Sequence, residues 1–406
     1  MAINTDASES QTRGFLYLYA LAVSGAAVAY VPFLAVILPA QLVLMAAGDA
    51  VSLLAYITFA GAIAAGASNI LFGWLSDRYL RRRRWIAGGM VASSAMLLLI
   101  PLADSFAMVI AMVIGWQICL NMMLAPLAAW AGDTVPNSQK GLLGGLLALA
   151  PAVGGISAVL ATWHADASLD YGNGITAILV MLMVGPLLIF GRPRAMPLLT
   201  GKAANSGPAP ANIVLAHIDS PVDRPAIKSM WLARLLVQIS EAALFAFLLL
   251  WLRSLDNQYT GRDVAVIFAI AAAISVGVTL RIGNWSDRTG QVILPLVLSA
   301  ALAAIGLVAM AIESGIALSI AGYLLFGVAT RVFLALHSSQ TLRLLTDPHK
   351  RGRNLGLFNL TSTIPSMIMP WLIIALVPSF GFSALLWILA GLSAAACLLL
   401  AIVARR

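Results

Sequence analysis

Four ionisable side chains lie well inside long apolar stretches of the sequence: Arg234, Glu241, Arg331 and His337. Ionisable groups are costly at such positions in a bilayer, so each is a candidate for function. At about 1.5 Å per residue, Glu241 lies about 18 Å above the start of its stretch and Arg331 about 13 Å above the end of its own. Because these depths are close, we expect the two side chains to face one cavity and to lie near enough to pair.

A buried pair of opposite charges has two interpretations. Burial favours a protonated carboxylate and a neighbouring guanidinium favours an ionised one, so Glu241 could exchange a proton as the pair forms and breaks. Proton coupling requires this behaviour. The alternative is a static ion pair that fixes the register of two helices. We expect His337 to hydrogen-bond at a helix end and Arg234 to extend toward the nearer membrane surface.

Neutral polar side chains in the apolar stretches form a second set of candidates. Gln117 and Asn121 are four residues apart and therefore share a helix face. The others lie in separate stretches: Tyr30, Gln238, Asn359 and Thr363. Amide groups can hydrogen-bond a hydroxyl-rich solute and aromatic faces can stack on a sugar ring, but the same groups also hold helices together in any membrane bundle.

The composition indicates which elements carry these residues. Of 406 residues, 61% are apolar and only 10% are charged. Soluble domains have about 25% charged residues, so a soluble enzyme is excluded, and the apolar content excludes a disordered chain. Continuous apolar runs favour membrane helices over a β-barrel. The sequence predicts an all-α polytopic membrane protein with twelve spans: 15–38, 50–75, 85–103, 105–131, 141–163, 174–190, 229–252, 263–284, 291–312, 315–340, 353–377 and 381–403.

Positive charge predicts the orientation of these spans. If both termini are cytoplasmic, twenty of the 24 Lys and Arg residues fall on the inside, and only Arg253 and Arg262 fall outside. Membrane proteins have this bias, so the net charge of +8 reflects topology, and we expect no nucleic-acid partner. Cys119 and Cys397 have neither metal nor disulfide spacing. We expect a multi-pass protein of the cell (inner) membrane, without metal or cofactor.

A polar segment divides the chain into two similar parts. It runs from Gly191 to Lys228 and has the composition of a solvated linker. The sequence therefore predicts an N-terminal six-helix bundle over 1–190, a cytoplasmic linker over 191–228 and a C-terminal six-helix bundle over 229–406. A Gly-x-x-x-Asp-Arg element occurs in both bundles, and its aspartates, Asp77 and Asp287, are 210 residues apart. This repeat indicates a duplicated six-helix unit.

At these residues the sequence resembles the major facilitator superfamily, whose signature is Gly-x-x-x-Asp-Arg and a basic run between helices 2 and 3. The first copy has Leu80 where glycine is common. The resemblance implies two pseudo-symmetric six-helix bundles, with helices 1, 4, 7 and 10 lining a central cavity. It also implies a cytoplasmic gate built from six residues: Asp77, Arg78, Arg81, Asp133, Asp287 and Arg288.

Five of the gate residues have an expected contact. Asp77 would accept hydrogen bonds at the start of helix 11, and Asp287 would do the same near Gly141 at the start of helix 5. Arg78 and Arg81 would pair with Asp133. The remaining arginines, Arg82 to Arg84, are interpreted as topology signals.

A narrower resemblance rests on Asn354 to Leu360 followed by Ile364-Pro365, and on Asn69 before Gly73-Trp74. These residues resemble glycoside–pentoside–hexuronide and sucrose-type carriers. Sodium-coupled members carry carboxylates on helix 2, where this chain has Ala65 and Asn69. The resemblance therefore implies no sodium coupling through that site.

The sequence favours a secondary active transporter, not an enzyme. It has no phosphate-binding loop and no metalloprotease or serine-hydrolase motif. We expect a proton-coupled carrier of a small organic solute, sugar-like or glycoside-like, working as a monomer in the lipid bilayer. One alternative is a proton-driven exporter of drug-like, peptide or lipid-like amphiphiles. A non-transporting receptor or assembly factor on the same fold is another.

Overall fold

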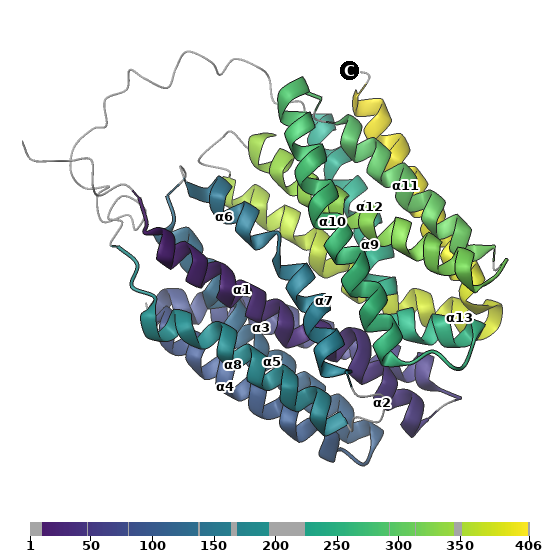
Figure 1. Cartoon of the computed structure of the whole chain (residues 1–406), viewed down its shortest axis with the longest axis horizontal. Helices are drawn as coiled ribbons and strands as arrows, with labels where there is room; N and C mark the ends of the chain where they lie inside the picture. The colour runs from purple at the N-terminus through teal and green to yellow at the C-terminus, as the bar shows by residue number, and fades with distance from the viewer. Residues whose placement is uncertain are drawn as a thin grey trace, which may run out of the picture.

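The computed structural model describes residues 10–46, 48–79, 81–136, 139–163, 169–194, 224–291, 293–312, 314–344 and 351–404. Within these ranges every regular element is helical (Figure 1). The helices in the first part of the chain are α1 (Arg13–Pro32), the π-helix η2 (Phe33–Ile37), α2 (Leu38–Met45), α3 (Ala50–Tyr79), α4 (Arg82–Leu99), the 3-10 helix η3 (Ile100–Leu102), α5 (Phe106–Thr134), α6 (Lys140–Leu147), α7 (Ala150–Ala161) and α8 (Leu169–Phe190). The second part contains α9 (Arg224–Leu255), α10 (Gly261–Thr289), α11 (Leu294–Ala311), α12 (Ile316–Leu344) and α13 (Arg351–Ala404).

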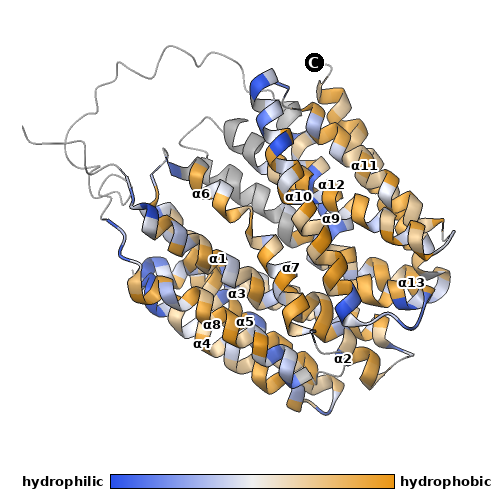
Figure 2. Cartoon of the chain, in the orientation of Figure 1, coloured by the Kyte–Doolittle hydropathy of each residue, from blue (hydrophilic) through white to orange (hydrophobic). Residues whose placement is uncertain are grey.

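The helices have the length and surface of membrane spans. Eleven helical segments among the described residues are long and apolar enough to cross a bilayer. Hydrophobic residues cover the helices along most of their length, and hydrophilic residues gather toward their ends (Figure 2). Large apolar side chains face outward, including Ile70, which is 76% exposed. Such a surface is stable in lipid but not in water.

The last helix contains two spans. Its 54 residues would extend about 80 Å at 1.5 Å per residue, far more than the bilayer's hydrocarbon thickness of about 30 Å. Gly381 breaks it with a positive φ of 73°, which favours glycine. Thr361, before the break, and Ser393, after it, contact Arg234 and Ser240 of α9 at similar depths, so the chain reverses at Gly381. The described helices therefore make twelve crossings.

The first span is longer than the predicted 15–38, because α1, η2 and α2 continue without a break from Arg13 to Met45. Pro39 has no N–H to donate to the carbonyl of Ala35, which disturbs the α-helical pattern. The chain passes through a π-helical turn, in which the N–H of Leu38 donates to the carbonyl of Phe33. The π-turn places Leu34 at the cavity described below.

Polar residues extend several other helices beyond the predicted apolar limits. Thr260 and Asp263 form a reciprocal capping box that starts α10 at Gly261, two residues before the predicted span. The last predicted linker residues, 224–228, form the first turn of α9, while 195–223 lie outside the described residues. Apolar run length therefore locates the span centres but underestimates the helix ends.

Helices α1–α8 and helices α9–α13 pack mainly among themselves, and two extensive contacts join the groups, beside smaller ones in which η2, α2 and α3 meet α9. In one, α7 lies against α10, and a Cβ at Gly155 would be 3.2 Å from the Cα of Ala269. In the other, α3 meets α13, where the rings of Phe59 and Trp371 have centroids 5.2 Å apart. The cavity lies between the groups.

Candidate functional site

A cavity of about 270 Å³ opens between the two groups of helices. Its walls come from α1 and η2, α3, α5, α9 and α13. Four of the predicted cavity residues line it: Tyr30, Gln117, Gln238 and Glu241. Most other lining side chains are apolar or small: Leu34, Ile57, Gly61, Ala62, Ala65, Val113, Ala242, Phe245, Ala246, Pro365 and Met369. Glu241 is the charged residue in this described lining.

Glu241 and Arg331 do not form the expected contact in this structure. Their charges interact at a distance, but no ion pair within 4.0 Å joins these two described residues. Arg331 instead donates to the carbonyl of Gly327 at 2.8 Å and lies near Tyr323 of the same helix. Its guanidinium lies 5.9 Å from the ring centroid of Phe268. Arg331 is therefore held outside the described cavity lining, because nearer groups on α10 and α12 satisfy it.

A series of aromatic rings connects the cavity to this arginine. Tyr30 is 6.3 Å from Phe245, Phe245 is 5.9 Å from Phe268, and Phe268 is 5.9 Å from Tyr323, all measured between ring centroids. Tyr30 and Phe245 line the cavity, whereas Phe268 and Tyr323 contact Arg331. The spacing suits edge-to-face packing, so these rings form a continuous wall.

The predicted amide pair forms part of a hydrogen-bonded chain. Asn69 of α3 donates to the side-chain oxygen of Asn121 at 3.1 Å, and Asn121 donates to the backbone carbonyl of Gln117 at 2.9 Å. Gln117 reaches the cavity, while Asn121 is buried behind it. Asn121 therefore lies behind Gln117 rather than in the cavity lining, with its amide nitrogen 3.5 Å from the side-chain oxygen of Gln117. The other α3 position noted in the sequence, Ala65, lines the cavity wall.

Arg234 and His337 belong to a polar network that joins α9, α12 and α13. Arg234 donates to Thr361 at 3.0 Å and to Ser338 at 2.8 Å. His337 is fully buried, and its Nε2 lies 2.9 Å from the carbonyl of Met230. The network holds the three helices together at the predicted cytoplasmic end. Arg234, which we expected to extend toward the membrane surface, bonds instead to the neighbouring helices α12 and α13.

Two further predicted cavity residues, Asn359 and Thr363, lie on α13, but their side chains are outside the part of the chain that the structure describes. Ser366 and Met369 of the same helix line the cavity. This segment of α13 therefore contributes one wall.

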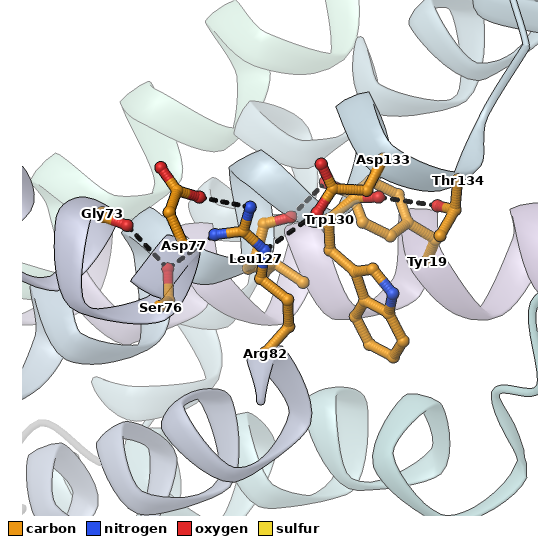
Figure 3. Close-up of polar contacts among 9 residues, drawn as sticks. All are labelled: Tyr19, Gly73, Ser76, Asp77, Arg82, Leu127, Trp130, Asp133 and Thr134. Carbon is orange, nitrogen blue, oxygen red and sulfur yellow. Dashed lines mark hydrogen bonds and ion pairs between the residues drawn. The ribbon is translucent and has the colours of Figure 1, made fainter. Parts of the chain in front are cut away.

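At the predicted cytoplasmic end, Arg82 bridges two carboxylates (Figure 3). It forms ion pairs with Asp77 at 2.5 Å and with Asp133 at 2.9 Å, and it donates to the hydroxyl of Ser76 at 2.6 Å. The expected partners of Asp133 were Arg78 and Arg81. Arg78 lies over the ring of Trp74 instead, at 5.6 Å.

The arrangement of α3 and α4 explains this correction. Arg81 precedes α4 with an exposed side chain, whereas Arg82 begins the helix and lies between the ends of α3 and α5. Among the described arginines, Arg82 at this corner is the one that reaches both carboxylates. In the second copy of the element, Arg288 is exposed and the side chain of Asp287 lies outside the described part.

Gln11, which sequence reasoning missed, forms a second cluster at the same end. Its side chain donates to the carbonyls of Thr134 and Arg194, each at 2.8 Å, and accepts from the Arg194 N–H at 2.9 Å. Its backbone exchanges hydrogen bonds with the amide of Gln139 at 2.7 and 3.0 Å. This cluster (Gln11, Thr134, Gln139 and Arg194) is called the Gln11 clamp below.

Comparison with known proteins identifies the family. The model of the Major Facilitator Superfamily matches residues 14–340 and 230–406. None of the curated proteins compared with the chain matches it. The chain is similar to a crystal structure of a point mutant of the peptide transporter POT, with a TM-score of 0.70 and 14% identity over 100% of this chain and 99% of that one.

The chain belongs to the Major Facilitator Superfamily and has the major facilitator fold. It is a multi-pass membrane transporter for a small solute, not an enzyme. At 14% identity the similarity to POT shows the fold alone. The narrower resemblance to sucrose-type carriers remains a prediction.

Proposed function

We propose that the protein is a proton-coupled secondary transporter in which Glu241 carries the proton. The carboxylate of Glu241 is supported as the coupling group by its place in the cavity between the two groups of helices. Among the described residues it has no hydrogen bond or close ion pair that would hold it in one protonation state. An ionisable group at such a site can bind a proton from one side and release it to the other.

Alternating access follows from the predicted division of the chain. The halves 1–190 and 229–406 would rock about the cavity while the segment 191–228 tethers them. The contacts between α7 and α10 and between α3 and α13 are the surfaces that such a motion repacks. We place both termini on the cytoplasmic side of the cell (inner) membrane, in agreement with the distribution of Lys and Arg.

The proposed cytoplasmic gate includes Arg82 and its contacts with Asp77 and Asp133. Arg82 ties α3 and α5 to the start of α4, so these three helix ends move as one body. Asp77 keeps a largely exposed side chain, which leaves it able to meet the opposite half. Arg78, Arg81 and the second copy, Asp287 and Arg288, remain proposed members of the gate.

The cavity walls favour an amphiphile over a sugar as the transported solute. A sugar presents hydroxyl groups in every direction, and each needs a hydrogen-bonding partner once buried. The described lining is mostly aliphatic and aromatic, and the Thr58 hydroxyl already donates within its own helix, to Leu54 and Ala55. We therefore propose the exporter of amphiphiles, with the sugar carrier as the second candidate.

Solute-induced pH changes in proteoliposomes test this function. The protein is reconstituted with an internal pH dye and challenged with sucrose, methyl β-D-glucopyranoside and a set of small amphiphiles. Solute entry that makes the lumen alkaline indicates exchange for protons, and entry that makes it acidic indicates symport. We expect exchange, and we expect Glu241→Gln to abolish the pH change because it removes the titrating group.

Asp104→Asn is the matched control, because it neutralises an exposed carboxylate in the loop between η3 and α5. The control should behave as the unmodified protein does. An undiminished pH change in Glu241→Gln would contradict the assignment of the proton to Glu241.

A further inference from the structure

We propose that the cavity binds a small amphipathic organic cation, held by the Glu241 carboxylate with its apolar body against Tyr30 and Phe245. This inference rests on the transporter function proposed above and names the substrate class of that site.

The charge of the cavity is the first argument. Among the described lining residues Glu241 is charged and the rest are neutral. A carboxylate facing a largely apolar space lacks the solvation that it has in water. A cationic ligand restores a partner to it, whereas an anion would be repelled. When Glu241 is ionised, the described lining offers a solute a negative charge.

Arg331 does not cancel this charge by contact. Its guanidinium donates to the Gly327 carbonyl and lies over Phe268, with Tyr323 nearby. It influences Glu241 only at a distance. Arg331 therefore leaves the carboxylate open on the cavity side, and it is not placed to bind the carboxylate of a zwitterionic or anionic solute.

The aromatic wall is the second argument. Tyr30 and Phe245 adjoin each other with centroids 6.3 Å apart, and both line the cavity with Glu241. Aromatic faces attract cations, and quaternary ammonium groups above all. Aliphatic side chains from η2, α3, α5 and α13 cover much of the remaining surface: Leu34, Ile57, Val113 and Met369. This combination suits a compact cation with an apolar body.

The same carboxylate would then serve the proton and the solute in turn. A protonated Glu241 is neutral and loses its attraction for the cation, so each ligand displaces the other. The apparent affinity for the cation falls as the pH is lowered, because protons compete for the site. Competition at one carboxylate yields exchange of cation for proton without a second coupling site.

Equilibrium binding to the full chain in lipid nanodiscs tests the proposal. The probe is radiolabelled benzyltrimethylammonium. Its competitors are neopentylbenzene, which has the same shape with carbon in place of nitrogen, and benzenesulfonate and methyl β-D-glucopyranoside. We expect the cation to bind at least about tenfold more tightly than neopentylbenzene, with the other two weaker still.

Variants of the protein separate the contribution of charge to binding from that of shape. Glu241→Gln should weaken cation binding at least about tenfold and leave neopentylbenzene unaffected, whereas Glu241→Asp should retain most of the cation's advantage. Tyr30→Leu should weaken the cation about fivefold and Tyr30→Phe should not, because Phe keeps the ring. Asp104→Asn serves as the control.

Equal binding of the cation and neopentylbenzene, or cation binding that Glu241→Gln does not change, overturns the proposal. Tighter binding of the glycoside does so too. These failures are distinct from a failure of the transporter function, which shows as cation binding without any accompanying movement of solute or protons in proteoliposomes.

Discussion

Arg82 is the residue at which three helices of the first group meet. Its planar guanidinium contacts Ser76 and Asp77 at the end of α3 and Asp133 at the end of α5, while its backbone starts α4. The side chain of Arg82 is only 12% exposed, although the two carboxylates that it contacts are more open to solvent. A guanidinium can serve two carboxylates and a hydroxyl at once, which the compact ammonium of lysine does not reproduce.

A double-mutant cycle measures the Arg82–Asp133 pair. We expect Arg82→Gln and Asp133→Asn to be non-additive in free energy of unfolding by about 0.5–1 kcal/mol, a small value because the aspartate is partly solvated. The measurement is chemical unfolding in mixed micelles. Arg84→Gln with Asp133→Asn is the control cycle, since Arg84 is exposed on the same turn of α4, and it should be additive. Additivity in both cycles would show that the Arg82 pair contributes nothing to stability.

Residue positions were more predictable than residue partners. The repeated Asp-Arg element locates Asp77, but five arginines follow it closely, and which of them pairs with Asp77 and Asp133 depends on where α4 starts. Likewise, Glu241 and Arg331 have similar depths, yet depth does not define the direction in which a side chain leaves its helix. Arg331 has nearer partners on its own helix, which a span count does not reveal.

At the scale of elements, Gly381 turns α13 into two antiparallel spans. Its φ of 73° and ψ of 178° belong to a region that is almost restricted to glycine. Beyond it, the hydroxyl of Ser383 donates to the carbonyl of Ala311 at 2.7 Å and ties the new span to the end of α11. The reversal therefore depends on the backbone of one residue and a contact two residues later.

Gly381→Ala should destabilise the protein by about 1–3 kcal/mol, because a Cβ is strained at this backbone conformation. Gly391→Ala is the matched control on the second part of α13, where a Cβ meets nothing within 4 Å. The control should be neutral or stabilising by up to about 1 kcal/mol, since alanine favours a helix. Thermal unfolding in one detergent compares the two. Equal stability of the variants would show that Gly381 is not needed for the turn.

The elements themselves were largely predictable, because a bilayer requires long apolar runs and the sequence supplies them. The π-helix η2 was not predictable from apolarity. It arises where Pro39 disturbs the hydrogen-bond pattern of a helix that otherwise continues through it. A π-turn also re-aims side chains, so the face of the first span that meets the cavity could not be derived from a regular 3.6-residue period.

For the whole molecule, the Gln11 clamp holds the segment that follows α8 against the first group of helices. Gln11 lies before α1, yet it binds both the segment after α5 and the segment after α8. The side-chain amide of Gln11 donates to the backbone carbonyl of Arg194 and accepts from its N–H. A neighbouring β-strand would form the same pair of hydrogen bonds. Arg194 is therefore anchored to the first group of helices, near the start of the segment 191–228 that we propose as the tether. Sequence inspection missed this because a polar residue near a terminus resembles any solvated one.

Gln11→Glu tests the clamp with almost no change of shape. The variant loses the two N–H donors and places a carboxylate against the carbonyls of Thr134 and Arg194, so the anchored segment should open about tenfold more often. Trypsin reports the opening, because it cleaves after Arg194, whereas Pro193 protects the bond after Arg192. We expect about tenfold faster cleavage after Arg194 in Gln11→Glu. Gln258→Glu, in the exposed loop before α10, should cleave at the unmodified rate. Unchanged cleavage in Gln11→Glu would mean that Arg194 is held by other contacts and that the tether is not anchored through Gln11.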